Sequence, residues 1–149
     1  MYVRVTPSAG LWNSTCITPP VMTHRALFVD DQDVILFAMR EYFSSLGYEV
    51  DCAGELGQAV GLVGERDYAL VIADLQLTGS RCTEGLDLVK AVREKSRATR
   101  VIMLTAYGSP EVEAEAKQCG VDVFLHKPQP LAEIARLAGR LLEGLPCVS

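Results

Sequence analysis

Short apolar segments recur along the chain and alternate with longer segments of helical periodicity. Four of the short segments are almost continuously apolar, which is typical of strands covered on both faces of a parallel sheet. These segments are Ala26–Val29, Tyr68–Ala73, Val101–Leu104 and Val121–Leu125. A fifth segment, Tyr48–Ala53, alternates apolar and polar side chains instead. This alternation predicts a strand at the edge of the sheet.

Amphipathic helices are predicted between these strands. The first, Val34–Leu46, places Ile35, Met39, Tyr42 and Leu46 on one stripe, as packing against a core requires. Apolar stripes predict further helices over residues 56–63, 86–92 and 131–142, and the cap signals Ser109-Pro110-Glu111 and Gly120 bound another over residues 110–119. Five strands and five helices in strict alternation require crossover connections. They predict an α/β fold, a parallel sheet with helices on both faces.

The composition changes at about residue 24. Residues 1–23 contain three prolines, several Ser and Thr, and no regular period, so we expect an irregular leader outside the fold. On this interpretation Met22 is a candidate start of the natural chain. We expect one domain over residues 24–143, and residues 144–149 as a short C-terminal tail with no room for an attached output domain.

Charge and hydropathy narrow the classes of function. Fourteen Lys and Arg stand against 19 Asp and Glu, a formal net charge of −5, which gives no electrostatic drive toward nucleic acid or anionic lipid. No segment approaches the roughly 20 apolar residues of a membrane-spanning helix. We therefore expect a cytoplasmic protein that binds neither nucleic acid directly nor a membrane. Five widely spaced cysteines and two histidines argue against a disulfide framework and a transition-metal site.

Positive charge is concentrated near the end of the third predicted helix, in Arg93, Lys95, Arg97 and Arg100. A short basic stretch is more often a solvated surface than a patch that binds nucleic acid. We therefore interpret this stretch as a solvated turn.

Polar residues follow the carboxyl ends of the predicted strands, where an open parallel sheet binds its ligands. The first strand ends in Asp30 and Asp31, the third in Asp74, the fourth in Thr105 and the fifth in Lys127. Each residue alone has a structural explanation as a cap, a turn residue or a solvated tip, but their shared position predicts one site. Three carboxylates repel one another unless a cation neutralises them, and oxygen ligands favour Mg²⁺, with Mn²⁺ as a substitute. A lysine and a hydroxyl beside them suit a phosphoryl group.

Four motifs at these strand ends carry a resemblance to a known family. They are Val29-Asp30-Asp31, Ile72-Ala73-Asp74-Leu75, Leu104-Thr105-Ala106 and His126-Lys127-Pro128. In this order they resemble the motifs of the receiver domain of two-component response regulators, of which the chemotaxis regulator is an example. The resemblance implies a doubly wound, flavodoxin-like sheet with strand order 2-1-3-4-5.

The resemblance also implies chemical roles. Asp74 would be the phosphoacceptor that takes a phosphoryl group from a sensor histidine kinase or a phosphotransfer protein. Thr105 would hydrogen-bond this group and Lys127 would pair with it. The metal ligands would be Asp30, Asp31, Asp74 and the backbone carbonyl of Gln76. Such a domain catalyses its own phosphorylation and dephosphorylation, but it is a signalling phosphoacceptor rather than a conventional enzyme.

A conformational switch would follow from phosphorylation in this family. Its residues would be Thr105, Ala106 and Phe124, and the population of the active form would rise when Thr105 contacts the phosphoryl group. The fourth predicted helix is poorly apolar, as a movable element requires. The partners would be a downstream effector protein and, on phosphorylation, a second copy in a homodimer.

Two other hypotheses fit parts of the pattern. In an aspartyl-phosphate phosphohydrolase the nucleophile would be Asp31, with Asp33 as the second acid, but Asp74 would then have no role. A receiver fold that binds partners without phosphorylation is the third hypothesis. It is disfavoured because every phosphorylation residue is retained.

Overall fold

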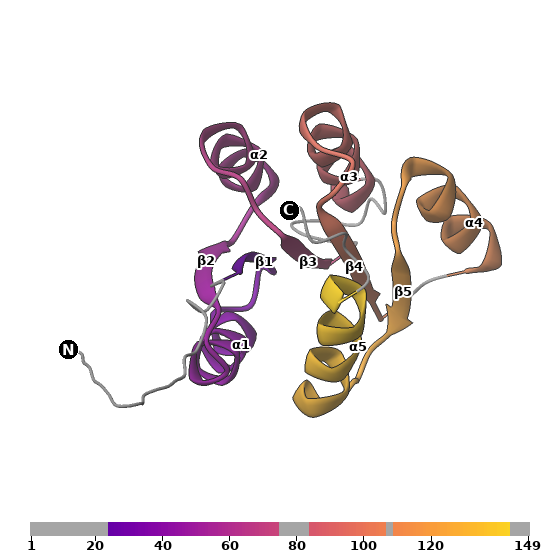
Figure 1. The fold of residues 1–149 in the computed structure, drawn as a ribbon. Coiled ribbons are helices and arrows are strands. Elements are labelled where there is room, and N and C mark those ends of the chain that lie inside the picture. Colours follow the sequence, from indigo (N-terminus) through magenta and orange to yellow (C-terminus); the bar gives the residue numbers. More distant parts are fainter. Residues whose placement is uncertain (1–23, 75–83, 107–108, 144–149) are drawn as a thin grey trace, which may run out of the picture.

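The computed structural model describes residues 24–74, 84–106 and 109–143 (Figure 1). The predicted leader, 1–23, and tail, 144–149, lie outside these ranges. Within them, strands and helices alternate along the chain. The strands are β1 Arg25–Val29, β2 Glu49–Ala53, β3 Leu70–Asp74, β4 Arg100–Thr105 and β5 Val123–His126, and the helices are α1 Asp33–Ser45, α2 Leu56–Glu65, α3 Glu84–Lys95, α4 Pro110–Cys119 and α5 Leu131–Glu143. None of these helices has the length and apolar character to cross a membrane.

The five strands form one parallel sheet in the order β2-β1-β3-β4-β5. Strand β2 lies at an edge, as its alternating pattern predicts. Helices α1 and α5 cover one face of the sheet, whereas α2, α3 and α4 lie on the other (Figure 1). The predicted α/β fold, its strand order and its helices on both faces are therefore confirmed.

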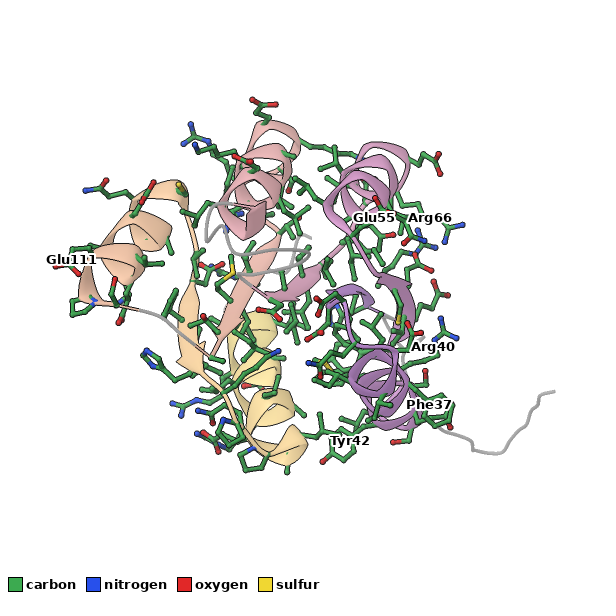
Figure 2. All side chains as sticks on the ribbon, turned by 180° about the vertical axis from the view of Figure 1, so that it is seen from behind. Phe37, Arg40, Tyr42, Glu55, Arg66 and Glu111 are labelled. Atoms are coloured by element: carbon green, nitrogen blue, oxygen red, sulfur yellow. The ribbon has the colours of Figure 1, made fainter. Side chains whose placement is uncertain are left out.

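Two apolar layers, one on each face of the sheet, make up the core. Successive residues of a strand point to opposite faces, so Phe28 and Ile72 lie in the layer with side chains of α1 and α5, whereas Leu27 and Val71 lie in the layer with side chains of α2 and α3. None of these four side chains is more than 1% exposed. Burying a side chain of this size contributes about 1.5–3 kcal/mol. Figure 2 shows how such side chains fill the space between the helices and the sheet.

Strands β3 and β5 begin later than their apolar segments predict. The predicted first residues, Tyr68 and Val121, are both buried, but they precede the strands. The backbone N–H of Val121 donates to the carbonyl of Ala116, so this residue still belongs to the turn that ends α4. The apolar segments therefore predicted the burial of these residues correctly, but they placed the beginnings of β3 and β5 too early.

The stripe predicted for α1 is partly wrong. Met39 is buried, together with Leu36 and Phe43, and Ile35 and Tyr42 of the predicted stripe are half-buried against the same core. Leu46 lies beyond the end of the helix and is 53% exposed. Phe43 packs edge-on against Phe28, with ring centroids 4.8 Å apart, a favourable geometry for an aromatic pair.

The prediction of a solvated basic turn at the end of α3 is wrong for two of its four residues, Arg93 and Arg100, which are half-buried. The side chain of Arg93 is 19% exposed and pairs with Asp122, and Arg100 pairs with the same carboxylate. The ammonium of Lys95 donates to backbone carbonyls. Lys95 and Arg97 are nevertheless exposed, as predicted. The reason is geometric, because the end of α3 lies beside other segments that offer carbonyl and carboxylate acceptors.

Candidate functional site

The sheet brings the predicted site residues to one edge. Asp30 directly follows β1, Asp74 and Thr105 end β3 and β4, and Lys127 directly follows β5. Because these strands are parallel and neighbours in the sheet, their carboxyl ends meet at the same edge. The predicted convergence of these residues is therefore observed.

Asp30, Asp31 and Asp74 form the acidic part of the site. One carboxylate oxygen from each lies within 4.8 Å of the other two. Asp30 and Asp74 are buried, with 3% and 8% exposure, whereas Asp31 faces solvent. The backbone N–H of Gln32 donates to Oδ1 of Asp30 at 2.9 Å. This bond orients the Asp30 carboxylate, and the sequence analysis did not identify it because it depends on the turn between β1 and α1.

Lys127 lies between two of these carboxylates. Its Nζ is 3.0 Å from Oδ2 of Asp30 and 3.0 Å from Oδ2 of Asp74. Burial alone would lower the pKa of Lys127, but the hydrogen bonds to the two carboxylates outweigh burial and raise it above the ordinary 10.5. The ammonium is therefore charged at neutral pH and neutralises part of the acidic cluster. The backbone N–H of Lys127 donates to the carbonyl of Thr105 at 2.7 Å, which holds the lysine beside β4.

The three predicted switch residues extend from the site toward α4. Thr105 is fully buried and Ala106, the next residue, is exposed. Phe124 is 9% exposed and packs in the layer between the sheet and α2, α3 and α4. It pairs with Met103 in the sheet register, so Phe124 and Thr105 lie on the same face of the sheet. The structure thus places both on the face that carries α4.

Gln129 is a site neighbour that sequence analysis missed. Its side-chain amide donates to the carbonyl of His126 at 2.9 Å, across the segment that contains Lys127. No sequence pattern marks this bond, because a glutamine between two prolines is equally compatible with a solvated side chain. Gln76, the predicted carbonyl ligand, lies outside the described residues.

The donor set fits a hard divalent cation. Carboxylate oxygens are the ligands that Mg²⁺ prefers, and Mg²⁺ keeps several of its waters. The exposed carboxylate of Asp31 gives such waters access, while the buried Asp30 and Asp74 offer fixed oxygens. Asp74 also contacts the ammonium of Lys127, so a phosphoryl group on this residue would lie among positive charges.

Comparisons with known proteins agree with this geometry. The sequence model of the response regulator receiver domain matches residues 26–138. Sporulation initiation phosphotransferase F of Bacillus subtilis is 31% identical over 114 residues, which cover 76% of this chain and 90% of that protein. Other relatives are longer, and the chain spans 25% and 48% of two of them.

Solved structures share the fold. A CheY-like response regulator receiver domain protein from Methanospirillum hungatei superimposes with a TM-score of 0.76 at 24% identity, covering 81% of this chain and 94% of that one. The beryllofluoride-activated NtrC4 receiver domain dimer gives a TM-score of 0.73 at 24% identity, covering 82% and 98%. At this level of identity the two structures support the fold alone.

Proposed function

Because the chain belongs to the response regulator receiver domain family of two-component systems, we propose that Asp74 is its phosphoacceptor. The position of the Asp74 carboxylate carries this proposal. Its Oδ2 lies 3.0 Å from Nζ of Lys127, and it shares a cluster of carboxylate oxygens with Asp30 and Asp31. A phosphoryl group arriving there would meet the lysine on one side and a bound cation on the other.

The reaction would be an in-line displacement at phosphorus. An oxygen of Asp74 attacks, the bond between phosphorus and the donor's histidine nitrogen breaks, and the imidazole leaves with the bonding electron pair. Mg²⁺, or Mn²⁺ in its place, would be held by Asp30, Asp31 and Asp74, with the backbone carbonyl of Gln76 as a further predicted ligand. When bound, the cation supplies positive charge to the phosphoryl oxygens.

Two side chains of the chain itself would stabilise the product. Lys127 would transfer its hydrogen bond from the Asp74 carboxylate to a phosphoryl oxygen, and Thr105 would donate its hydroxyl to another. The move of Thr105 toward the phosphoryl group would raise the population of the active form, with Ala106 and Phe124 changing position alongside it.

The partners proposed for this chain follow from its family. A sensor histidine kinase or a phosphotransfer protein would supply the phosphoryl group, and a downstream effector protein would bind the active form. A homodimer on phosphorylation belongs to the proposal too, as an expectation from the family. The domain boundaries at residues 24 and 143 and a cytoplasmic location stay predictions from the sequence.

Labelling with acetyl phosphate in the presence of Mg²⁺ tests the proposal. The wild-type chain is expected to gain one phosphoryl group, detected by intact mass, and to lose it with time. Asp74→Asn should gain none under the same conditions, and chelation of Mg²⁺ should abolish labelling of the wild type. Labelling of Asp74→Asn to the wild-type level would contradict the assignment of Asp74.

The phosphohydrolase alternative, with Asp31 as nucleophile, is less well supported. Asp31 and Asp33 are exposed, whereas Lys127 forms its ion pairs with Asp30 and Asp74. If the alternative held, Asp74→Asn would retain turnover of acetyl phosphate and Asp31→Asn would lose it.

A further inference from the structure

The short connection between β5 and α5 carries the lysine of the site. Residues 127–130 lead from the end of β5 at His126 to the start of α5 at Leu131. Lys127 is the first residue of this connection, and its Nζ lies 3.0 Å from a carboxylate oxygen of Asp30 and 3.0 Å from one of Asp74. The direction in which this side chain leaves the backbone depends on the peptide group that precedes it.

That peptide group, between His126 and Lys127, is hydrogen-bonded at both of its polar ends. Its N–H donates to the carbonyl of Thr105 in β4 at 2.7 Å. Its C=O accepts from Nε2 of Gln129 at 2.9 Å. The group is planar, so it cannot rotate without disturbing both bonds, and hydrogen bonds in such a chain polarise and strengthen one another. The backbone at Lys127 is therefore fixed from two sides.

Gln129 provides a donor that the local backbone does not. The N–H and C=O of a trans peptide point in opposite directions, so the carbonyl of His126 points away from β4. Strand β5 lies at an edge of the described sheet, and no described strand pairs with it on that side. Pro128 and Pro130 have no backbone N–H to offer. The side-chain amide of Gln129 thus takes the place of a neighbouring strand.

The backbone around Gln129 is constrained. A residue that precedes a proline is restricted to extended conformations, and Gln129 precedes Pro130. The backbone N–H groups of Glu133 and Ile134 donate to the carbonyl of Pro130 at 3.0 and 3.1 Å, which anchors the connection to the first turn of α5. A constrained backbone loses less conformational entropy when the Gln129 side chain forms its bond.

We propose that Gln129 is a positioning residue for phosphoryl transfer, which fixes the backbone of Lys127 so that the ammonium reaches the phosphoryl oxygens. This inference rests on the proposed function of Asp74. In that reaction Lys127 exchanges its contact with the Asp74 carboxylate for a phosphoryl oxygen. The lysine has a flexible four-carbon stem, so a fixed backbone limits the conformations that compete with the productive one. Gln129 acts through Lys127 and not on the phosphoryl group.

The rate of labelling by acetyl phosphate in Mg²⁺ tests the positioning role. Gln129→Met keeps the approximate length of the side chain and removes its donor. The rate constant of labelling should fall about fivefold, which corresponds to the loss of one hydrogen bond. Gln118→Met is the matched control, because it makes the same substitution at an exposed position of α4, and it should label as the wild type does.

A double-mutant cycle separates positioning from a general structural role. In a Lys127→Gln background, Gln129→Met should not slow labelling further, because the side chain that Gln129 positions is absent. A structural role would slow labelling by the same factor in both backgrounds. Equal factors in the two backgrounds, or labelling of Gln129→Met at the wild-type rate, would overturn the positioning role.

Hydrogen exchange without Mg²⁺ or acetyl phosphate tests the hydrogen bonds themselves. In Gln129→Met the amide of Lys127 should exchange about fivefold faster than in the wild type, with the amide of Ile72 in β3 unaffected. Unchanged exchange at Lys127 would overturn the inference whether or not Asp74 accepts a phosphoryl group. If Gln129→Met fails to fold, Gln129→Glu keeps the shape of the side chain, loses the donor and should show the same two effects.

The remaining outcomes distinguish this inference from the proposed function. A wild type that acetyl phosphate does not label, or an Asp74→Asn variant that is labelled to the wild-type level, would overturn the phosphoacceptor role and the positioning role with it. Normal labelling of the wild type, combined with equal factors in the cycle, would overturn the positioning role alone.

Discussion

At the scale of single residues, Lys127 offsets part of the negative charge of the site. Its ammonium pairs with Asp30 and Asp74, two of the three carboxylates proposed to hold the cation. On the proposed function, the lysine and a divalent cation would be neighbours of like charge that compete for the same oxygens. The lysine would then assist phosphoryl transfer and weaken metal binding at the same time.

Lys127→Gln is expected to bind Mg²⁺ about tenfold more tightly than the wild type, because a like charge beside the cation is removed, an effect of ~1.4 kcal/mol. Labelling by acetyl phosphate should slow by about tenfold or more, since the phosphoryl oxygens lose a partner. Isothermal titration with Mg²⁺ measures the first effect. Lys117→Gln is the control, because Lys117 is exposed and pairs with Glu113. Equal or weaker Mg²⁺ affinity in Lys127→Gln would refute the competition.

The raised pKa of Lys127 also predicts a pH dependence. A basic group whose pKa is higher in the folded than in the unfolded protein stabilises the fold. This contribution is complete at pH values below the ordinary, unfolded pKa and is lost as the pH rises from there through the folded pKa. The stability difference between the wild type and Lys127→Gln should therefore be constant from about pH 8 to the ordinary 10.5 and should shrink above it. Urea unfolding of both proteins over this range measures the difference. A difference that stays constant or grows above pH 10.5 would show that the ion pairs do not raise the pKa.

At the scale of elements, α4 shows what local signals determine. Ser109, Pro110 and Gly120 predict its two ends, and the structure confirms both, with the Ser109 cap and the left-handed Gly120 in place. Cap signals succeed because they depend on backbone groups within one turn. The stripe of α1 was less well predicted, because periodicity did not identify Leu36 and Phe43 among its buried residues and included Leu46, which lies beyond the helix.

Removing the cap of α4 should loosen that helix locally. Ser109→Ala loses the bond from the Val112 N–H, worth about 1 kcal/mol, so amide exchange in the first turns of α4 should accelerate by roughly fivefold. Ser109→Asp supplies another capping oxygen and should keep the protection. Global unfolding by urea should change less than exchange at α4. Exchange that is equally fast in Ser109→Ala and the wild type would show that packing, not the cap, holds the amino end.

At the scale of the whole molecule, the two ends of the strands carry different groups of polar side chains. The carboxyl ends of the strands hold the carboxylates and Lys127, and the amino ends of β4 and β5 lie beside the network of Arg93 and Asp122. Both depend on the same core, in which Phe43 is fully buried between Phe28 and Tyr48.

Truncation of that core should be costly. Phe43→Ala is expected to lower the free energy of unfolding by about 3–5 kcal/mol, a large fraction of the roughly 5–15 kcal/mol typical of a domain. Phe37→Ala is the matched control on the same helix. Phe37 is 66% exposed and lies on the outer side of α1 (Figure 2), so its loss should change stability by about 0.5 kcal/mol or less. Urea denaturation of both variants measures the contrast, and equal losses would contradict the assignment of the core.

By itself the sequence determined the alternation of strands and helices, because periodicity and caps are properties of neighbouring residues. It also determined that Asp30, Asp74, Thr105 and Lys127 meet, because parallel strands must bring their carboxyl ends to one edge. Only the tertiary structure decided which atoms touch there and that Arg93 pairs with Asp122. Those contacts join residues far apart in the chain, so they depend on how the helices pack onto the sheet, and packing geometry leaves no periodic trace in the sequence.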